Sequence, residues 1–245
     1  MGTALAVQGL ANARDLGGMQ RIDGPLTPTA VFVRAEMLDR VNEPGWAALR
    51  GLGVRTVIDL RRPGEATGAV PDDILRLRVD LDGDEREFWE PFETDGRWGT
   101  PLYYLAHLQE LPHRLARVVR AIASAPDGAI LFHCGAGWDR TGLVAAVLLK
   151  AIGVTEDAAV ADYLASFANA DAMTALHERS FDVDERRRVL ATFGHTPESA
   201  FREMYRQLDV EEWFGHARVD EDDASSIFTW RGHVAARPGA PRVDK

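Results

Sequence analysis

The sequence has a single cysteine, Cys134, among its 245 residues. One cysteine excludes an intramolecular disulfide and is typical of a reducing compartment, so we expect a cytoplasmic protein. No apolar run approaches the length of a membrane span, and residues 1–10 lack the basic start and long apolar centre of a secretory signal, so no integral membrane association is expected. A net charge of −10 disfavours nucleic acids and anionic membrane surfaces as general partners.

The sequence also lacks paired histidines. Its seven histidines show no spacing typical of zinc ligands, so we predict no metal site and no cofactor. Hydrophobic residues make up 46% of the chain, enough for one sizeable core. We expect a single domain over residues 1–234 and an irregular tail over residues 235–245, which contain Pro238 and Pro241.

Local patterns alternate between strands and helices. Strands are expected at 30–34, 54–60, 75–81 and 130–133, and helices at 44–52, 101–125, 142–152, 155–168, 172–190, from Thr196 onward and after Asp209. This order predicts an α/β fold with a central, mainly parallel sheet flanked by helices.

Three further stretches have weaker patterns. Residues 82–100 have no clear period and form either a surface loop anchored by aromatic side chains or a mobile lid. The basic run 186–188 is expected to solvate a helix face. The acidic run 220–223 is expected in a polar connector.

The cysteine lies between an apolar strand and a helix-forming stretch, in the segment His133-Cys134-Gly135-Ala136-Gly137-Trp138-Asp139-Arg140-Thr141-Gly142. A strand, a glycine-rich turn and a helix aim backbone N–H groups and the positive end of the helix dipole at one point, which suits a phosphate dianion. Arg140 adds a planar fork of donors. Such settings lower a cysteine pKa to roughly 3.5–7.5. The segment therefore predicts a phosphate site formed by residues 135–138, 140 and 141, with Cys134 as nucleophile.

The neighbours of the cysteine have two interpretations each. His133 either fixes loop hydrogen bonds and lowers the thiol pKa or is an ordinary histidine at a strand end. Thr141 either caps the helix or donates a hydrogen bond to the cysteine sulfur. A buried, inert cysteine is disfavoured by Gly135 and Gly137, which suit close backbone approach better than core packing.

His-Cys-x5-Arg-Thr-Gly resembles the signature of the cysteine-dependent protein tyrosine and dual-specificity phosphatases, and Asp139 before the arginine narrows the resemblance to their atypical bacterial branch. Residues 12–18 (Asn-Ala-Arg-Asp-Leu-Gly-Gly), 57–61 (Val-Ile-Asp-Leu-Arg, followed by Glu65) and 162–166 (Asp-Tyr-Leu-Ala-Ser) resemble further motifs of that branch in the same order. The resemblance runs from about residue 9 to about residue 215. It implies a cysteine-phosphatase-like fold and a phosphoric monoester hydrolase, foremost a protein-tyrosine phosphatase.

The resemblance implies a two-step reaction on a phosphorylated protein or small phosphoester, with phosphate, sulfate or vanadate as site ligands. Cys134 attacks phosphorus, and the loop amides and Arg140 stabilise the transferred group. Asp139 protonates the leaving oxygen and then activates water. Alternatively, Asp139 only complements the helix dipole. The rival acids are Asp82, Asp84 and Asp95.

Two other motifs supply supporting residues. Arg14 and Asp15 either orient the phosphate loop from below or close a structural turn. Asp59 and Arg61 lie at the carboxyl end of an expected parallel strand, where α/β sheets place ligands.

Trp138 stands where the branch usually has a lysine, and Ala13 where it usually has phenylalanine. Trp138 forms either an aromatic wall, which favours phosphotyrosine over phosphoinositides, or a packing residue over the loop. The alternative functions are a phosphoinositide or inositol phosphate phosphatase of the same mechanism, a rhodanese-like sulfurtransferase and a phosphate-binding module without catalysis.

Overall fold

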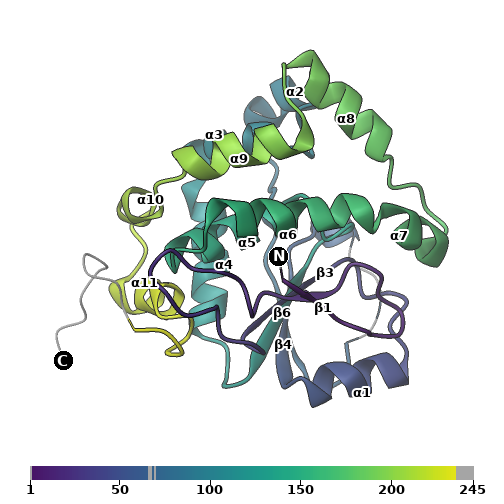
Figure 1. The fold of residues 1–245 in the computed structure, drawn as a ribbon, viewed down its shortest axis with the longest axis vertical. Helices are drawn as coiled ribbons and strands as arrows, with labels where there is room; N and C mark the ends of the chain where they lie inside the picture. Colours follow the sequence, from purple (N-terminus) through teal and green to yellow (C-terminus); the bar gives the residue numbers. More distant parts are fainter. Residues whose placement is uncertain (1, 66–67, 69, 236–245) are drawn as a thin grey trace.

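A six-stranded sheet with strand order β1-β2-β3-β6-β4-β5 forms the centre of the molecule in a computed structural model, which describes residues 2–65, 68 and 70–235 (Figure 1). Strands β3, β6, β4 and β5 run parallel, and β1 and β2 are antiparallel additions at one edge. The expected α/β fold with a mainly parallel sheet is confirmed. The strands are β1 (Thr3–Ala4), β2 (Arg14–Asp15), β3 (Phe32–Ala35), β4 (Val54–Asp59), β5 (Leu75–Arg78) and β6 (Ala129–His133).

Helices cover both faces of the sheet (Figure 1). Because successive side chains of a strand point to opposite faces, Val57 and Leu131 pack with Trp46 of α1, whereas Ile58 and Phe132 join the larger core that holds α4 and α5. The helices are α1 (Glu43–Gly51), α2 (Arg86–Thr94), α3 (Tyr104–Glu110), α4 (Pro112–Ala123), α5 (Arg140–Ala151), α6 (Glu156–Ala168), α7 (Ala170–His177), α8 (Val183–Thr192), α9 (Pro197–Gln207), α10 (Val210–His216) and α11 (Glu221–Phe228), with 3-10 turns at Pro63–Glu65 and Pro101–Tyr103.

Two helices expected from the sequence are each broken. The expected helix at 101–125 is interrupted at Leu111, because the following Pro112 disfavours helical backbone in the residue before it. The expected helix at 172–190 is interrupted after His177, where Glu178 takes a left-handed conformation with φ of 51°, and Asp182 caps the start of α8. The resulting segment 178–182 lies beside the candidate site.

Two segments expected to be irregular contain helices instead. Within residues 82–100, α2 buries Phe88, Trp89 and Phe92. With only nine residues, this helix is too short to produce a clear hydrophobic period in the sequence. The acidic run 220–223 caps and begins α11, where carboxylates complement the helix dipole. The expected tail lies outside the described residues from 236 onward.

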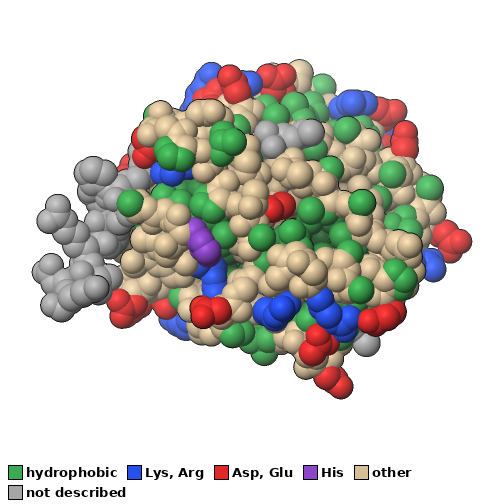
Figure 2. All heavy atoms as spheres, turned by 60° about the horizontal axis from the view of Figure 1, so that its bottom comes forward, with side chains coloured by type: hydrophobic (Ala, Val, Ile, Leu, Met, Phe, Trp, Pro, Cys, Tyr) green, Lys and Arg blue, Asp and Glu red, His purple; other side chains and the backbone are tan. Residues whose placement is uncertain are grey.

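Acidic side chains outnumber basic ones in the sequence, with 38 Asp and Glu against 28 Lys and Arg. Acidic and basic side chains intermingle around the margin of the face shown in Figure 2, which has no broad basic area. Within the described residues, no helix is both long and apolar enough to cross a bilayer. An anionic substrate must therefore be attracted by charges inside a local site.

Candidate active site

The loop that carries the cysteine connects a fully buried strand to the most buried helix. β6 ends at His133, residues 134–139 form the loop, and α5 begins at Arg140. Among the described residues, no acceptor receives a hydrogen bond from the amides of residues 135–139. Gly137 has a φ of +62°, and a Cβ there would lie 2.3 Å from the carbonyl oxygen of Ala35. The loop therefore needs glycine at this position.

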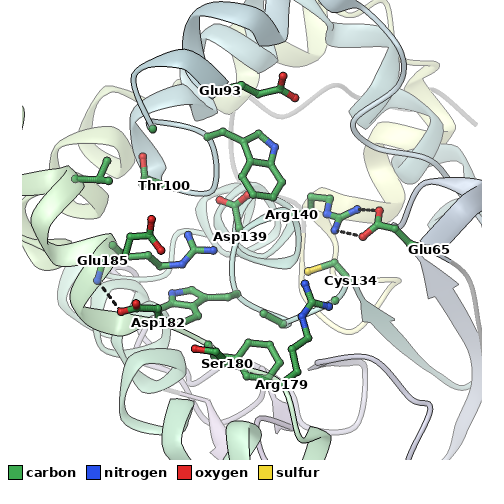
Figure 3. Close-up of a pocket in the computed structure, with 18 residues that line it drawn as sticks. Glu65, Glu93, Thr100, Cys134, Asp139, Arg140, Arg179, Ser180, Asp182 and Glu185 are labelled. Carbon is green, nitrogen blue, oxygen red and sulfur yellow. Dashed lines mark hydrogen bonds and ion pairs between the residues drawn. The ribbon is translucent and has the colours of Figure 1, made fainter.

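Figure 3 shows the cavity above this loop. It has a volume of about 600 Å³ and includes Cys134, Asp139 and Arg140 in its lining. Cys134 is only 2% exposed and lies at the base. The remaining walls come from the 3-10 turn at 63–65, from α2 and the residues after it, and from the segment 179–189. The structure thus brings together the three residues expected to perform the chemistry.

Arg140 is held in a defined orientation by two carboxylates. Its terminal nitrogens donate to both oxygens of Glu65, at 2.7 and 2.8 Å. Its Nη1 also lies 3.3 Å from Asp82 Oδ2, and Asp82 is 2% exposed. Glu65 takes one N–H of each terminal nitrogen, which leaves further N–H groups of the guanidinium for phosphate oxygens.

The rival acids lie away from the cavity lining. Asp82 contacts Arg140 and Arg62, and burial raises the pKa of its carboxyl. Asp84 is fully exposed and pairs with Arg114 at 3.4 Å, while Asp95 pairs with Arg97 at 2.8 Å. The geometry therefore favours Asp139 over all three for contact with a bound phosphoester.

Asp139 is held by two tyrosines that sequence reasoning missed. The Tyr103 hydroxyl donates to Asp139 Oδ2 at 2.9 Å, and the Tyr104 hydroxyl donates to the Asp139 carbonyl oxygen at 2.8 Å. Burial raises the pKa of the Asp139 carboxyl to about 6. The side chain forms no capping hydrogen bond, and its Oδ1 has no partner among the described residues. These contacts suit proton transfer better than helix capping.

Tyr103→Phe is expected to shift the pH dependence of catalysis toward higher pH. The hydroxyl donates to the ionised carboxylate and so lowers the pKa of Asp139; its removal raises that pKa. The basic limb of kcat/KM for an alkyl phosphate, which needs the protonated acid, should move up by about one pH unit. Tyr104→Phe is the matched control, because its hydroxyl bonds only to the main chain. An unmoved limb in Tyr103→Phe, or equal movement in both variants, would contradict this assignment.

A buried polar network supports the loop formed by residues 134–139. Asn12 Nδ2 donates to the Ala136 carbonyl at 3.1 Å, and Arg34 Nη2 donates to the Gly137 carbonyl at 2.8 Å. Asp162 on α6 pairs with Arg34 and, at 3.0 Å, with Arg14. Burial alone would raise the pKa of Asp162, but the two arginines hold it well below its usual range. The network fixes the positions of the loop carbonyls of Ala136 and Gly137.

Arg14 and Asp15 separate into two roles. Arg14 lies within the network under the loop and donates to Asn12, Asp162 and Ser166. Asp15 instead accepts from the amides of Gly17 and Ala30 and closes a turn. Support of the loop therefore fits Arg14, and closure of a structural turn fits Asp15.

Asp162→Ala is expected to lower the free energy of unfolding by about 3–5 kcal/mol, because it leaves two buried guanidinium groups without their counter-charge. Urea unfolding followed by circular dichroism measures the change. Asp157→Ala is the control on the same helix: its exposed carboxylate pairs with Arg202 at 2.6 Å, and its loss should change stability by less than about 1 kcal/mol. An equal change in the free energy of unfolding for the two substitutions would contradict a stabilising role of the buried network.

His133, Asp59 and Arg61 lie behind the loop. His133 Nδ1 is 3.1 Å from the Cys134 carbonyl oxygen, and burial lowers the pKa of the imidazole to about 4. The neutral ring supplies no positive charge to the thiol, so its hydrogen bond to the loop is the contribution that the structure supports. Asp59 bonds to Arg61 at 2.9 Å and to Arg76 at 2.7 Å. Neither Asp59 nor Arg61 lines the cavity.

Thr141 does not cap the helix, since it is the second residue of α5. Its hydroxyl is buried and has no hydrogen-bond partner within the described part of the chain. No bond to the sulfur of Cys134 is therefore formed in this structure.

Trp138 is packed by its neighbours and also contributes to the cavity lining. Its ring is 1% exposed and meets Phe167 edge to face at 4.3 Å. The guanidinium carbon of Arg186 lies 4.6 Å above the ring. The expectation that Arg186 only solvates a helix face is wrong, because α8 turns this residue into the cavity. Arg187 and Arg188 are exposed as expected.

Comparison with known proteins gives matches along most of the chain. The model of the tyrosine phosphatase family matches residues 5–228. A tyrosine-protein phosphatase of Nostoc commune is 35% identical over 57% of this chain and 49% of its own length. The triple specificity protein phosphatase PtpB of Mycobacterium tuberculosis is 33% identical over 66% of this chain and 70% of its own length. The chain thus spans about half the length of the Nostoc relative.

Proposed function

The chain belongs to the tyrosine phosphatase family, and on this premise we propose that it hydrolyses phosphotyrosine in proteins through a phosphocysteine intermediate, with residues 1–234 as one catalytic domain. The observation that carries the proposal is the loop geometry. Cys134 lies at the base of a cavity, the amides of residues 135–139 have no acceptor among the described residues, and Arg140 is fixed beside them. A single cysteine that stays reduced fits work in the cytoplasm.

In the first step, the sulfur of Cys134 attacks phosphorus in line with the tyrosine oxygen. The S–P bond forms, and the P–O bond to the phenol breaks. Asp139 gives its proton to the departing oxygen. The amides and Arg140 hold the non-bridging oxygens and stabilise their charge in the transition state.

In the second step, water attacks the phosphocysteine. Asp139, now ionised, takes a proton from that water, phosphate is released and the thiolate is restored. A carboxyl whose pKa is about 6 suits both steps, because both protonation states are populated near neutral pH. Tyr103 keeps the carboxyl aimed at the cavity in each state.

The cavity walls favour an aromatic phosphoester. Trp98, Phe181 and Val189 line the cavity above the loop, and their apolar surfaces suit a phenyl ring. Because Cys134 lies at the base and is almost fully buried, the phosphate of a long side chain such as phosphotyrosine reaches it more readily than that of phosphoserine.

A phosphate-release panel tests this function. Matched peptides containing phosphotyrosine, phosphoserine or phosphothreonine are compared with soluble phosphoinositides, and we expect the highest kcat/KM for phosphotyrosine. Higher kcat/KM for phosphoinositides would indicate a lipid substrate instead of a protein substrate. Sulfur transfer from thiosulfate to cyanide without phosphate release would indicate a rhodanese-like enzyme. Binding of phosphopeptide without turnover would leave only a phosphate-binding module.

A further inference from the structure

One face of α8 forms a wall of the cavity. Asp182, Glu185, Arg186 and Val189 line it, at the i, i+3, i+4 and i+7 spacing of one helix face. The next two residues, at 187 and 188, point away and are exposed. The helix therefore directs one arginine of three consecutive arginines toward the phosphate loop.

The guanidinium of Arg186 is confined but has no anionic partner. It lies over the Trp138 ring at 4.6 Å. On another side, Gly99 approaches so closely that a Cβ there would lie 2.9 Å from Nη1. Among the described residues, none forms an ion pair or a side-chain hydrogen bond with this guanidinium. Most of its N–H donors are thus available to a ligand.

A second arginine lies on the same side of the cavity. Arg179 lies in the segment before α8, and Figure 3 shows its side chain directed toward Cys134. Its guanidinium carbon is 5.9 Å from the ring centre of Phe181, and no described carboxylate pairs with it. The cavity lining therefore carries two cations besides Arg140.

Among the cavity's carboxylates, the buried Asp139 lies near enough to Arg186 for the positive charge of Arg186 to lower the pKa of its carboxyl, and the others are held elsewhere. Glu65 is bonded to Arg140, Glu93 pairs with Arg86 at 3.3 Å, and Asp182 accepts the amide of Glu185 at the start of α8. The Glu185 carboxylate lies beyond ion-pair distance of either arginine, since no such pair is formed in the described chain. The charge of Arg140 is balanced by Glu65 and Asp82, whereas Arg179 and Arg186 form no ion pair among the described residues.

We propose that Arg186 and Arg179 form a second anion subsite beside the phosphate loop, which receives a carboxylate or second phosphate on a residue adjoining the phosphotyrosine of a protein substrate. This inference rests on the proposed function. Arg186 supplies a planar fork stacked on Trp138, and Arg179 supplies a second positive charge directed toward Cys134. The subsite selects substrates by their flanking charge, and Arg186 in addition lowers the pKa of the nearby Asp139 carboxyl.

The test compares two phosphotyrosine peptides that differ only in their flanking residues, glutamate in one and glutamine in the other. The readout is the ratio of their kcat/KM values, because a general loss of folding or of Asp139 function affects both peptides equally. Wild type should prefer the acidic peptide by about 10-fold or more, the effect of one charge-assisted hydrogen bond. Arg186→Gln should bring the ratio close to one, and Arg179→Gln should lower it.

Two further variants separate the subsite from general surface charge. Arg187→Gln removes an equal charge from the next position of α8 and should leave the ratio unchanged. Arg186→Lys keeps the charge but loses the planar fork, so it should retain part of the preference.

The outcomes separate this inference from the proposed function. Hydrolysis of neither peptide by wild type would overturn both. Hydrolysis of both peptides at equal kcat/KM, or equal loss of preference in Arg186→Gln and Arg187→Gln, would overturn the subsite alone. A multiply phosphorylated inositol that outcompetes the acidic peptide and loses its advantage in Arg186→Gln would assign the subsite to a lipid headgroup and overturn its assignment to a protein.

Discussion

Cys134→Ser is expected to abolish turnover, with a loss of at least about 10⁴-fold in kcat, while phosphate and vanadate binding stay measurable. A serine hydroxyl is close in size to a thiol but remains protonated at neutral pH, so the nucleophile is lost. The free amides of residues 135–139 and the guanidinium of Arg140 remain in place. Isothermal titration with vanadate and steady-state hydrolysis of a phosphotyrosine peptide measure the two properties separately.

Arg140→Lys provides the contrast to this variant. An ammonium group cannot reproduce the pair of hydrogen bonds to Glu65 or the fork that binds phosphate oxygens. Both binding and turnover should therefore fall. Turnover retained by the pure Cys134→Ser protein would rule out cysteine catalysis, and binding retained by Arg140→Lys would remove the arginine from the phosphate site.

Asp139→Asn is expected to lower the rate with poor leaving groups by about 10²–10⁴-fold, the usual contribution of general acid–base catalysis. An amide keeps the hydrogen bond with Tyr103 but carries no transferable proton. A nitrophenyl ester, whose leaving group needs little protonation, should lose less in the first step. In wild type, kcat/KM for the poor leaving group should fall as pH rises through about 6, where Asp139 loses its proton, and this limb should vanish in the variant.

Asp84→Asn is the control among the rival acids, since its exposed carboxylate pairs only with Arg114 in the described chain. Its activity should stay within a few-fold of wild type. Equal losses for good and poor leaving groups in Asp139→Asn would indicate a structural aspartate. A large loss of activity in Asp84→Asn would indicate that the general acid lies in the segment before α2.

The sequence is sufficient to predict the parts of the site whose residues are contiguous in the chain. The strand, loop and helix around Cys134 follow from local chemistry, because an apolar run, two glycines and a helix-forming stretch determine where amides and the cysteine lie. The parallel sheet follows from the alternation of strands and helices. Neither inference requires knowledge of long-range packing.

The parts that depend on tertiary contacts could not be predicted. Tyr103 reaches Asp139 across 36 residues of sequence, and adjacent tyrosines after a proline give no sign of such a contact. Arg186 looked like its two exposed neighbours, because its direction depends on where α8 begins. That start depends on the left-handed Glu178 and the Asp182 cap, within a stretch whose composition favoured one continuous helix.

Three candidates for the proton donor were also unresolved by sequence. The sequence segment that contains Asp82, Asp84 and Asp95 has no clear hydrophobic period. Only the folded structure shows that Asp82 pairs with Arg140, whereas the other two pair with Arg114 and Arg97. A carboxylate's environment depends on burial and on partners distant in sequence, and residue type alone reports neither.

The most direct test of the phosphocysteine mechanism is mass spectrometry of the enzyme quenched into denaturant during turnover of a phosphotyrosine peptide. We expect one phosphoryl group on the peptide that contains Cys134. With a nitrophenyl ester, Asp139→Asn should accumulate more of it, because the intermediate is hydrolysed more slowly without the base. Cys134→Ser should carry none. Continued turnover with no phosphoryl group on Cys134, or with the group on another residue, would contradict the phosphocysteine mechanism.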